Sequence, residues 1–163
     1  MNQPGNTEAK ASEFEFDVIV VGAGPGGATA AYYLVEESRR QGKPLSVGLL
    51  DRARFPRDKY CGDAWCAPAL DILEDMGVLQ KIIADGVYQD TTSGGFVSPS
   101  GESYMTSEGG DAQVSKQNRT FAIKRMICDE RIARRAAEAG ATLIEEANVS
   151  GAELNADGMW RVR

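Results

Sequence analysis

Three glycines, Gly22, Gly24 and Gly27, have the G-x-G-x-x-G spacing that is typical of turns that bind a dinucleotide. The first glycine permits a tight turn, the second lets the backbone approach a pyrophosphate, and the third allows a helix to pack closely on a strand. Pro25 and Gly26 lie within the same turn, and we expect them to make it rigid and narrow. A helix that begins here presents unpaired N–H groups and a partial positive charge to the phosphates.

The segments on either side of the glycines have the patterns that such a turn requires. Residues 17–21 (DVIVV) are a short, mostly β-branched run that is typical of a buried parallel strand. A helix is predicted over about residues 26–40, and the glycine and proline within residues 41–44 are expected to end it. Residues 45–50 (LSVGLL) predict a second parallel strand. The alternative is a glycine-rich turn in some other kind of α/β protein.

Asp51 directly follows the second predicted strand, 24 positions after Gly27. In dinucleotide-binding folds, a carboxylate about 20 residues beyond the glycines accepts hydrogen bonds from the ribose hydroxyls. The same carboxylate repels a 2′-phosphate, which disfavours NADP as the resident dinucleotide. Arg52, the next residue, is also assigned to the cofactor site, and its positive charge weakens this argument against NADP.

Composition narrows the classes of protein to which the chain can belong. Its 163 residues have room for one domain with a sizeable core, and a net charge of −6 argues against nucleic-acid binding. The absence of histidine excludes Ser-His-Asp and Cys-His catalysis and His-ligated metals from the chain, and we expect no metal site. Three cysteines without C-x-x-C spacing indicate a reduced, cytoplasmic setting. No segment has the length needed to span a membrane.

A strongly basic loop leaves the carboxyl end of the second predicted strand. It contains Arg52, Arg54, Arg57 and Lys59. Ligands of open α/β sheets bind at this edge, so these cations could face a pyrophosphate. For Arg54 and Arg57 individually, a solvated position is the favoured interpretation.

Farther along the loop, the sequence begins to resemble a known family. The runs GAGPGGATAA, LLDRARFPRDKYCGD and ALDILEDMG, which begin at Gly22, Leu49 and Ala69, are similar to the geranylgeranyl reductase family of flavoproteins. That family lies within the class of FAD enzymes that includes p-hydroxybenzoate-hydroxylase-type monooxygenases and flavin-dependent halogenases. The resemblance runs from about Glu15 but covers only the N-terminal portion of the family, so it implies an incomplete chain. A natural short module is the alternative.

The resemblance implies FAD as the cofactor and adds residues to its site. In the family, the F-P-x-x-K-x-C-G segment crosses the isoalloxazine side of FAD, which implies that Cys61, Gly62 and Ala64 are neighbours of the flavin. The resemblance also implies that Arg125 lies against the FAD and that the backbone of Val149 lies near the adenine. The full set assigned to the cofactor is Gly22, Gly24, Pro25, Gly26, Gly27, Asp51, Arg52, Cys61, Gly62, Ala64, Arg125 and Val149.

For two of these residues, a structural role is the alternative to a contact with the cofactor. Without the resemblance, Cys61 reads as a buried core thiol. Arg125 could form a salt bridge with Asp129, four positions on.

The predicted fold class is α/β, a Rossmann-like FAD-binding fold with an antiparallel β insertion. Residues 1–14 are polar and predict a disordered tail, and residues 15–86 are the first segment of the FAD-binding domain. Residues 87–119 are the β insertion, expected to pack beside that domain and to begin a substrate domain. Residues 120–163 are the second, incomplete segment of the FAD-binding domain.

Finer elements are predicted within these segments. Residues 68–76 and 78–84 predict helices whose apolar faces belong to the core, and Phe96 and Tyr104 of the insertion are candidates for a substrate pocket.

The last part of the chain predicts a strand and a helix over residues 120–140, with an apolar stripe on the helix. Residues 141–144 and 148–154 predict strands that return to the nucleotide-binding sheet, and residues 155–158 predict a hairpin turn.

The function implied by the resemblance is an FAD-dependent oxidoreductase that reduces carbon–carbon double bonds of a geranylgeranyl-type isoprenoid. Reduced FAD would supply the hydride, and NAD(P)H is a candidate donor of the electrons that reduce it. The expected partner is a lipophilic isoprenoid, with no nucleic acid, no transmembrane segment and peripheral membrane contact as a further expectation. An FAD-dependent monooxygenase or halogenase is the alternative on the same scaffold, and a non-catalytic nucleotide-binding fragment is an alternative of another class.

Overall fold

The computed structural model describes residues 14–91, 93–107 and 119–163. The predicted tail lies outside the described residues except for Phe14, and so do residues 108–118 of the predicted insertion. Within the described part of the chain, no helix combines the length and the apolar character needed to cross a membrane.

Three parallel strands form the sheet from which the glycine-rich turn emerges. Strands β1 (Val18–Val21), β2 (Val47–Leu50) and β8 (Thr142–Ile144) lie in the order β1-β2-β8. The register places Val21 beside Leu50, so β1 and β2 end at the same level of the sheet. This confirms the parallel pairing of the first two predicted strands and brings the segments that follow them together at one edge.

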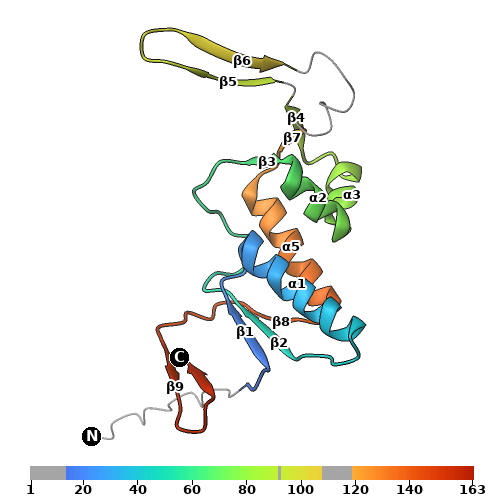
Figure 1. Cartoon of the computed structure of the whole chain (residues 1–163), viewed down its shortest axis with the longest axis vertical. Helices are drawn as coiled ribbons and strands as arrows, with labels where there is room; N and C mark the ends of the chain where they lie inside the picture. The colour runs from blue at the N-terminus through green and yellow to red at the C-terminus, as the bar shows by residue number, and fades with distance from the viewer. Residues whose placement is uncertain (1–13, 92, 108–118) are drawn as a thin grey trace, which may run out of the picture.

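Two helices, α1 (Pro25–Arg40) and α5 (Arg125–Ala139), lie side by side over this sheet (Figure 1). Both helices bury small side chains, such as Ala28 on α1 and Ala133 on α5, which lets their backbones approach closely. The apolar stripe predicted for the second helix is confirmed, because its members are all buried: Cys128, Ile132, Ala136 and Ala139.

A second sheet, which is antiparallel, lies near the N-terminal end of α5 (Figure 1). Its strands are β3 (Ala64–Cys66), β7 (Thr120–Ala122) and β4 (Gln89–Thr91), in the order β3-β7-β4. Helices α2 (Ala67–Asp75) and α3 (Val78–Ala84) follow β3. The strand at residues 120–122 therefore pairs outside the parallel sheet, and α5 leads from one sheet to the other.

The apolar faces of α2 and α3 belong to the core, as predicted, except that Ile83 of α3 is 38% exposed. Leu70 and Leu73 of α2 and Leu79 and Ile82 of α3 are almost wholly buried. They share one core with Phe121 of β7, which joins these helices to the second sheet.

Strands β5 (Ser93–Val97) and β6 (Ser103–Ser107) form a hairpin that lies away from the parallel sheet (Figure 1). Phe96 faces Tyr104 across this hairpin, and their exposed fractions are 82% and 68%. The expectation that the hairpin packs beside the first domain is wrong, because these aromatic side chains lie at the surface.

The last hairpin differs from a second prediction, that residues 148–154 return to the parallel sheet. Strand β9 (Ala152–Leu154) pairs with β10 (Trp160–Val162) and does not join the parallel sheet. The predicted turn between them is confirmed and closes the pair, and the Ser150 N–H donates to the Arg163 carbonyl oxygen at 2.6 Å. The backbone groups of this polar segment therefore bond within the hairpin and not to β8.

Candidate dinucleotide-binding site

The glycine-rich turn has the strand–turn–helix geometry that its spacing predicts. Gly22 follows β1 with φ +97°, a left-handed conformation that favours glycine. A Cβ atom on Gly27 would lie 2.0 Å from the Gly22 carbonyl oxygen, so the helix approaches the turn too closely for any side chain. Gly24 caps α1 without a side-chain hydrogen bond, which leaves the first N–H groups of the helix without a side-chain cap.

Asp51 joins the end of β2 to this turn. Its Oδ2 accepts a hydrogen bond from the Ala23 N–H at 2.9 Å, and its Oδ1 accepts one from the Ala53 N–H at 3.0 Å. The side chain is buried, which keeps these bonds away from water. An ionised carboxylate has about four lone-pair sites, so Asp51 keeps acceptor capacity for a further donor.

Arg57 lies beside the glycine-rich turn, at the edge of the sheet where the sequence places a group of basic residues. A solvated position was the favoured interpretation, but the side chain is only 11% exposed. Its Nη1 lies 3.1 Å from Asp129 Oδ2, and its Nη2 lies 3.4 Å from Asp51 Oδ2. The guanidinium also lies over the Phe55 ring, 5.0 Å from its centroid. The local sequence gave no signal for the contact with Asp129, which is 72 positions away.

Arg125 forms a salt bridge with Asp129, which was the alternative to a cofactor contact in the sequence analysis. Its Nε lies 2.6 Å from Asp129 Oδ1 and its Nη2 lies 2.9 Å from Asp129 Oδ2. The hydrogen bonds to Asp129 raise the pKa of Arg125, more strongly than burial lowers it. The backbone N–H of Arg125 also donates to Asp63 Oδ1 at 3.1 Å, which ties the start of α5 to the loop before β3.

The residues assigned to the flavin side lie on the loop before β3 and at its first residue. Cys61, Gly62 and Ala64 are exposed, so the alternative of a core thiol for Cys61 is wrong. Interactions with Cys61 also raise the pKa of Arg125, so this loop lies close to the start of α5. Arg52 is exposed at the beginning of the same loop.

Val149 lies just beyond a segment that is hydrogen-bonded to Asp51. The Ala147 N–H donates to the Asp51 carbonyl oxygen at 2.9 Å, and Val149 itself is half-buried. The structure therefore brings the turn, the end of β2 and the segment after β8 to one edge of the sheet.

The space beside the turn fits a diphosphate. A Cβ atom on Gly26 would meet no atom within 4 Å, and one on Gly24 would meet only Arg57 Nη2, at 3.6 Å. The glycine face of the turn is thus open and bordered by a cation, at a helix N-terminus. An anion such as the pyrophosphate of a dinucleotide suits all three features.

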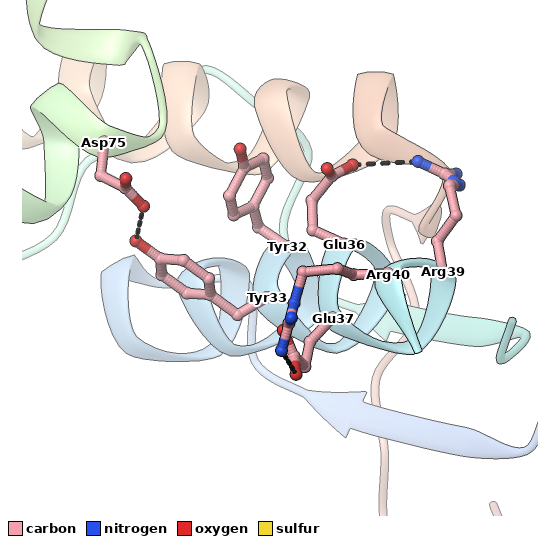
Figure 2. Close-up of a pocket in the computed structure, with 7 residues that line it drawn as sticks. All are labelled: Tyr32, Tyr33, Glu36, Glu37, Arg39, Arg40 and Asp75. Carbon is pink, nitrogen blue, oxygen red and sulfur yellow. Dashed lines mark hydrogen bonds and ion pairs between the residues drawn. The ribbon is translucent and has the colours of Figure 1, made fainter. Parts of the chain in front are cut away.

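A surface pocket lies elsewhere, along the C-terminal half of α1 (Figure 2). Tyr33 donates a hydrogen bond to Asp75 Oδ2 at 2.5 Å across it, and burial together with this carboxylate raises the pKa of Tyr33 to about 12. None of the residues assigned to the cofactor lines it; its walls are Tyr32, Tyr33, Glu36, Glu37, Arg39, Arg40 and Asp75.

Several known proteins are similar to this chain in sequence. Conditioned medium factor receptor 1 of Dictyostelium discoideum is 38% identical over 151 residues, which cover 90% of this chain and 28% of that protein. Menaquinone reductase of Mycobacterium tuberculosis (strain ATCC 25618 / H37Rv) is 33% identical, over 78% of this chain and 28% of that protein. Digeranylgeranylglycerophospholipid reductase of Methanocaldococcus jannaschii is 28% identical, over 90% and 32%. The chain thus spans about a third or less of the length of these relatives.

Solved structures superpose on this chain and have a similar fold. The flavin-dependent brominase Bmp2 superposes with a TM-score of 0.69 at 21% identity, covering 90% of this chain and 35% of that chain. A geranylgeranyl bacteriochlorophyll reductase-like protein from Thermoplasma acidophilum superposes with a TM-score of 0.65 at 22% identity, covering 86% and 32%. The family model described as FAD binding domain matches residues 15–159. The chain belongs to this FAD-binding family, and its cofactor is FAD.

Proposed function

We propose that this chain is the FAD-binding part of an oxidoreductase that reduces carbon–carbon double bonds of a geranylgeranyl-type isoprenoid. The observation that carries the cofactor part is the open glycine face at the start of α1, with Arg57 Nη2 beside Gly24. The isoprenoid part is supported by the resemblance of this chain to a digeranylgeranylglycerophospholipid reductase and by the reductase motifs that run through the loop before β3.

Each part of the site would hold a different part of FAD. The turn and the N-terminus of α1 would bind the pyrophosphate through backbone N–H groups, with Arg57 as the neighbouring cation. Asp51 would accept a hydrogen bond from a ribose hydroxyl with its remaining lone pair, and the backbone of Val149 would border the adenine.

The flavin end would lie toward the loop before β3. Cys61 and Gly62 would border the ring there, and Arg125, held by Asp129, would supply a fixed positive charge beside it. FAD supplies the hydride chemistry when it is bound, and these residues would orient the ring. Asp63 and Tyr60 lie in the same loop and are the candidates for a proton donor, although the Asp63 carboxylate already accepts from the Arg125 N–H.

The test is an assay of the protein expressed from its complete reading frame. The purified protein is expected to carry flavin absorbance and, after anaerobic reduction with dithionite, to add a pair of hydrogen atoms to each double bond of a geranylgeranyl lipid. Mass spectrometry of the product measures this addition. A hydroxylated or halogenated product under oxygen and halide would favour the monooxygenase or halogenase alternative, and a protein without bound flavin would contradict the proposal entirely.

A further inference from the structure

The geometry points to Asp129 as a positioning residue for the cofactor site. We infer that Asp129 holds the Arg57 guanidinium so that one of its nitrogens remains beside the glycine turn, where it meets the pyrophosphate. This inference rests on the proposed FAD site, because it concerns how that site is organised.

Asp129 cannot touch a ligand directly, because its side chain has an exposed fraction of 0%. It lies in the second turn of α5 and binds two cations at once. Arg125 takes both carboxylate oxygens, at 2.6 and 2.9 Å, and Arg57 Nη1 approaches Oδ2 at 3.1 Å. Any effect of Asp129 on the cofactor must therefore pass through these guanidinium groups.

The two halves of the Arg57 guanidinium have different surroundings. Nη1 is bound by Asp129, whereas Nη2 is 3.4 Å from Asp51 and faces the position that a Cβ on Gly24 would take. The contact with Asp51 is long for a charge-assisted hydrogen bond, which is normally about 2.7–2.9 Å. Nη2 is thus the less firmly bound end and remains free to bind an incoming phosphate oxygen.

Asp129 also determines how Arg57 is shared between the two carboxylates that it contacts. The network holds two carboxylates, Asp51 and Asp129, and two guanidinium groups, Arg57 and Arg125, so its charges balance. Without the Asp129 charge, Asp51 is the remaining anion within reach of Arg57 in this network. The guanidinium would then turn toward Asp51, away from the phosphates, and would occupy the acceptor sites that the ribose needs.

The experiment compares the binding of ADP and adenosine to the protein expressed from its complete reading frame. The ratio of the two dissociation constants isolates the contribution of the diphosphate, because both ligands share the adenosine part. We expect Asp129→Asn to lower this preference for ADP by about tenfold, the range expected for one hydrogen bond between charged groups. Glu130→Gln is the matched control, since Glu130 is the next residue of α5 and pairs with Arg134 at the surface, and its ratio is expected to match that of the wild type.

A purely structural role predicts a different result. If Asp129 only stabilises the fold, Asp129→Asn weakens ADP and adenosine equally, the ratio is unchanged, and the inference is overturned. A wild-type protein that binds neither FAD nor ADP overturns the proposed function as well, and is recognised before any variant is made.

A measurement on the wild type covers the case in which Asp129→Asn does not fold. The guanidinium N–H signals of Arg57 can be assigned by NMR through their loss in Arg57→Lys. We expect them to be resolved before any ligand is added, and to move with ADP but not with adenosine. Signals that become resolved only after ADP is added would show that the ligand, and not Asp129, orders the guanidinium, which overturns the inference.

Discussion

The carboxylate of Asp51 accepts a hydrogen bond from the backbone N–H of Ala23 at 2.9 Å. This bond joins the end of β2 to the turn after β1, two segments separated by 28 positions in the chain. The residue expected to bind the ribose therefore also supports the turn expected to bind the pyrophosphate. Substitutions at this edge should affect both stability and cofactor affinity, and the predictions below separate the two.

Gly27→Ala should destabilise the protein, because the new Cβ would lie 2.0 Å from the Gly22 carbonyl oxygen. The overlap forces the helix away from the turn, at a cost of about 1–3 kcal/mol in the free energy of unfolding. Urea unfolding of the apo protein measures the change. Gly26→Ala is the matched control, since a Cβ there meets no atom within 4 Å, and its unfolding midpoint should equal or exceed that of the wild type.

Gly24→Val should abolish FAD binding while the fold is largely kept. A Cβ at this position has an ordinary contact of 3.6 Å with Arg57 Nη2, but the valine methyl groups fill the space that the pyrophosphate needs. Titration with FAD, followed by flavin fluorescence, gives the affinity, and circular dichroism reports the fold. Gly151→Val, in the segment that leads to β9, should bind as the wild type does, and wild-type affinity in Gly24→Val would mean that the motif is misread.

Asp51→Ala should weaken FAD binding by about 1.5–3 kcal/mol, the scale of hydrogen bonds to a charged group. The absorbance spectrum of the flavin that remains bound should not change, because the ribose is distant from the isoalloxazine. Some loss of stability is expected too, since the Ala23 and Ala53 N–H groups lose their acceptor. A large spectral shift at unchanged affinity would remove Asp51 from the ribose site.

The Cys128 thiol should make stability depend on alkaline pH. Burial raises its pKa to about 12 from an ordinary value of 9.0, and the Asp129 carboxylate adds to the rise. Because the folded pKa is the higher one, this contribution to stability is complete below about pH 9 and is lost as the pH rises toward 12. The difference in unfolding free energy between wild type and Cys128→Ala, measured by urea unfolding at each pH, should therefore shrink over this interval.

The turn and its flanking elements could be predicted because the information is local. Gly22 and Gly27 specify the turn by their spacing, and the runs on either side specify a strand and a helix of nearly the observed length. The Arg125–Asp129 pair could also be considered in advance, because residues four apart on a helix are neighbours.

Arg57 and the final strands could not be predicted in the same way. The position of Arg57 depends on a carboxylate 72 positions away, and nothing in the basic loop distinguishes it from Arg54, which is exposed. The segment over residues 148–154 has strand-like residues, but the pattern does not say which partner it takes. The nearby turn at residues 155–158 brings β10 next to β9 at once, so the local pairing prevails over a return to the parallel sheet.

The measurement that tests the account most directly is FAD binding by Arg57→Met and Arg54→Met, in the protein expressed from its complete reading frame. Isothermal titration calorimetry of the apo protein should give one FAD per chain for the wild type and for Arg54→Met, whose side chain is exposed. Arg57→Met should bind about tenfold or more weakly, because the charge beside Gly24 is lost. Equal affinity in all three proteins, or no binding by the wild type, would contradict the account.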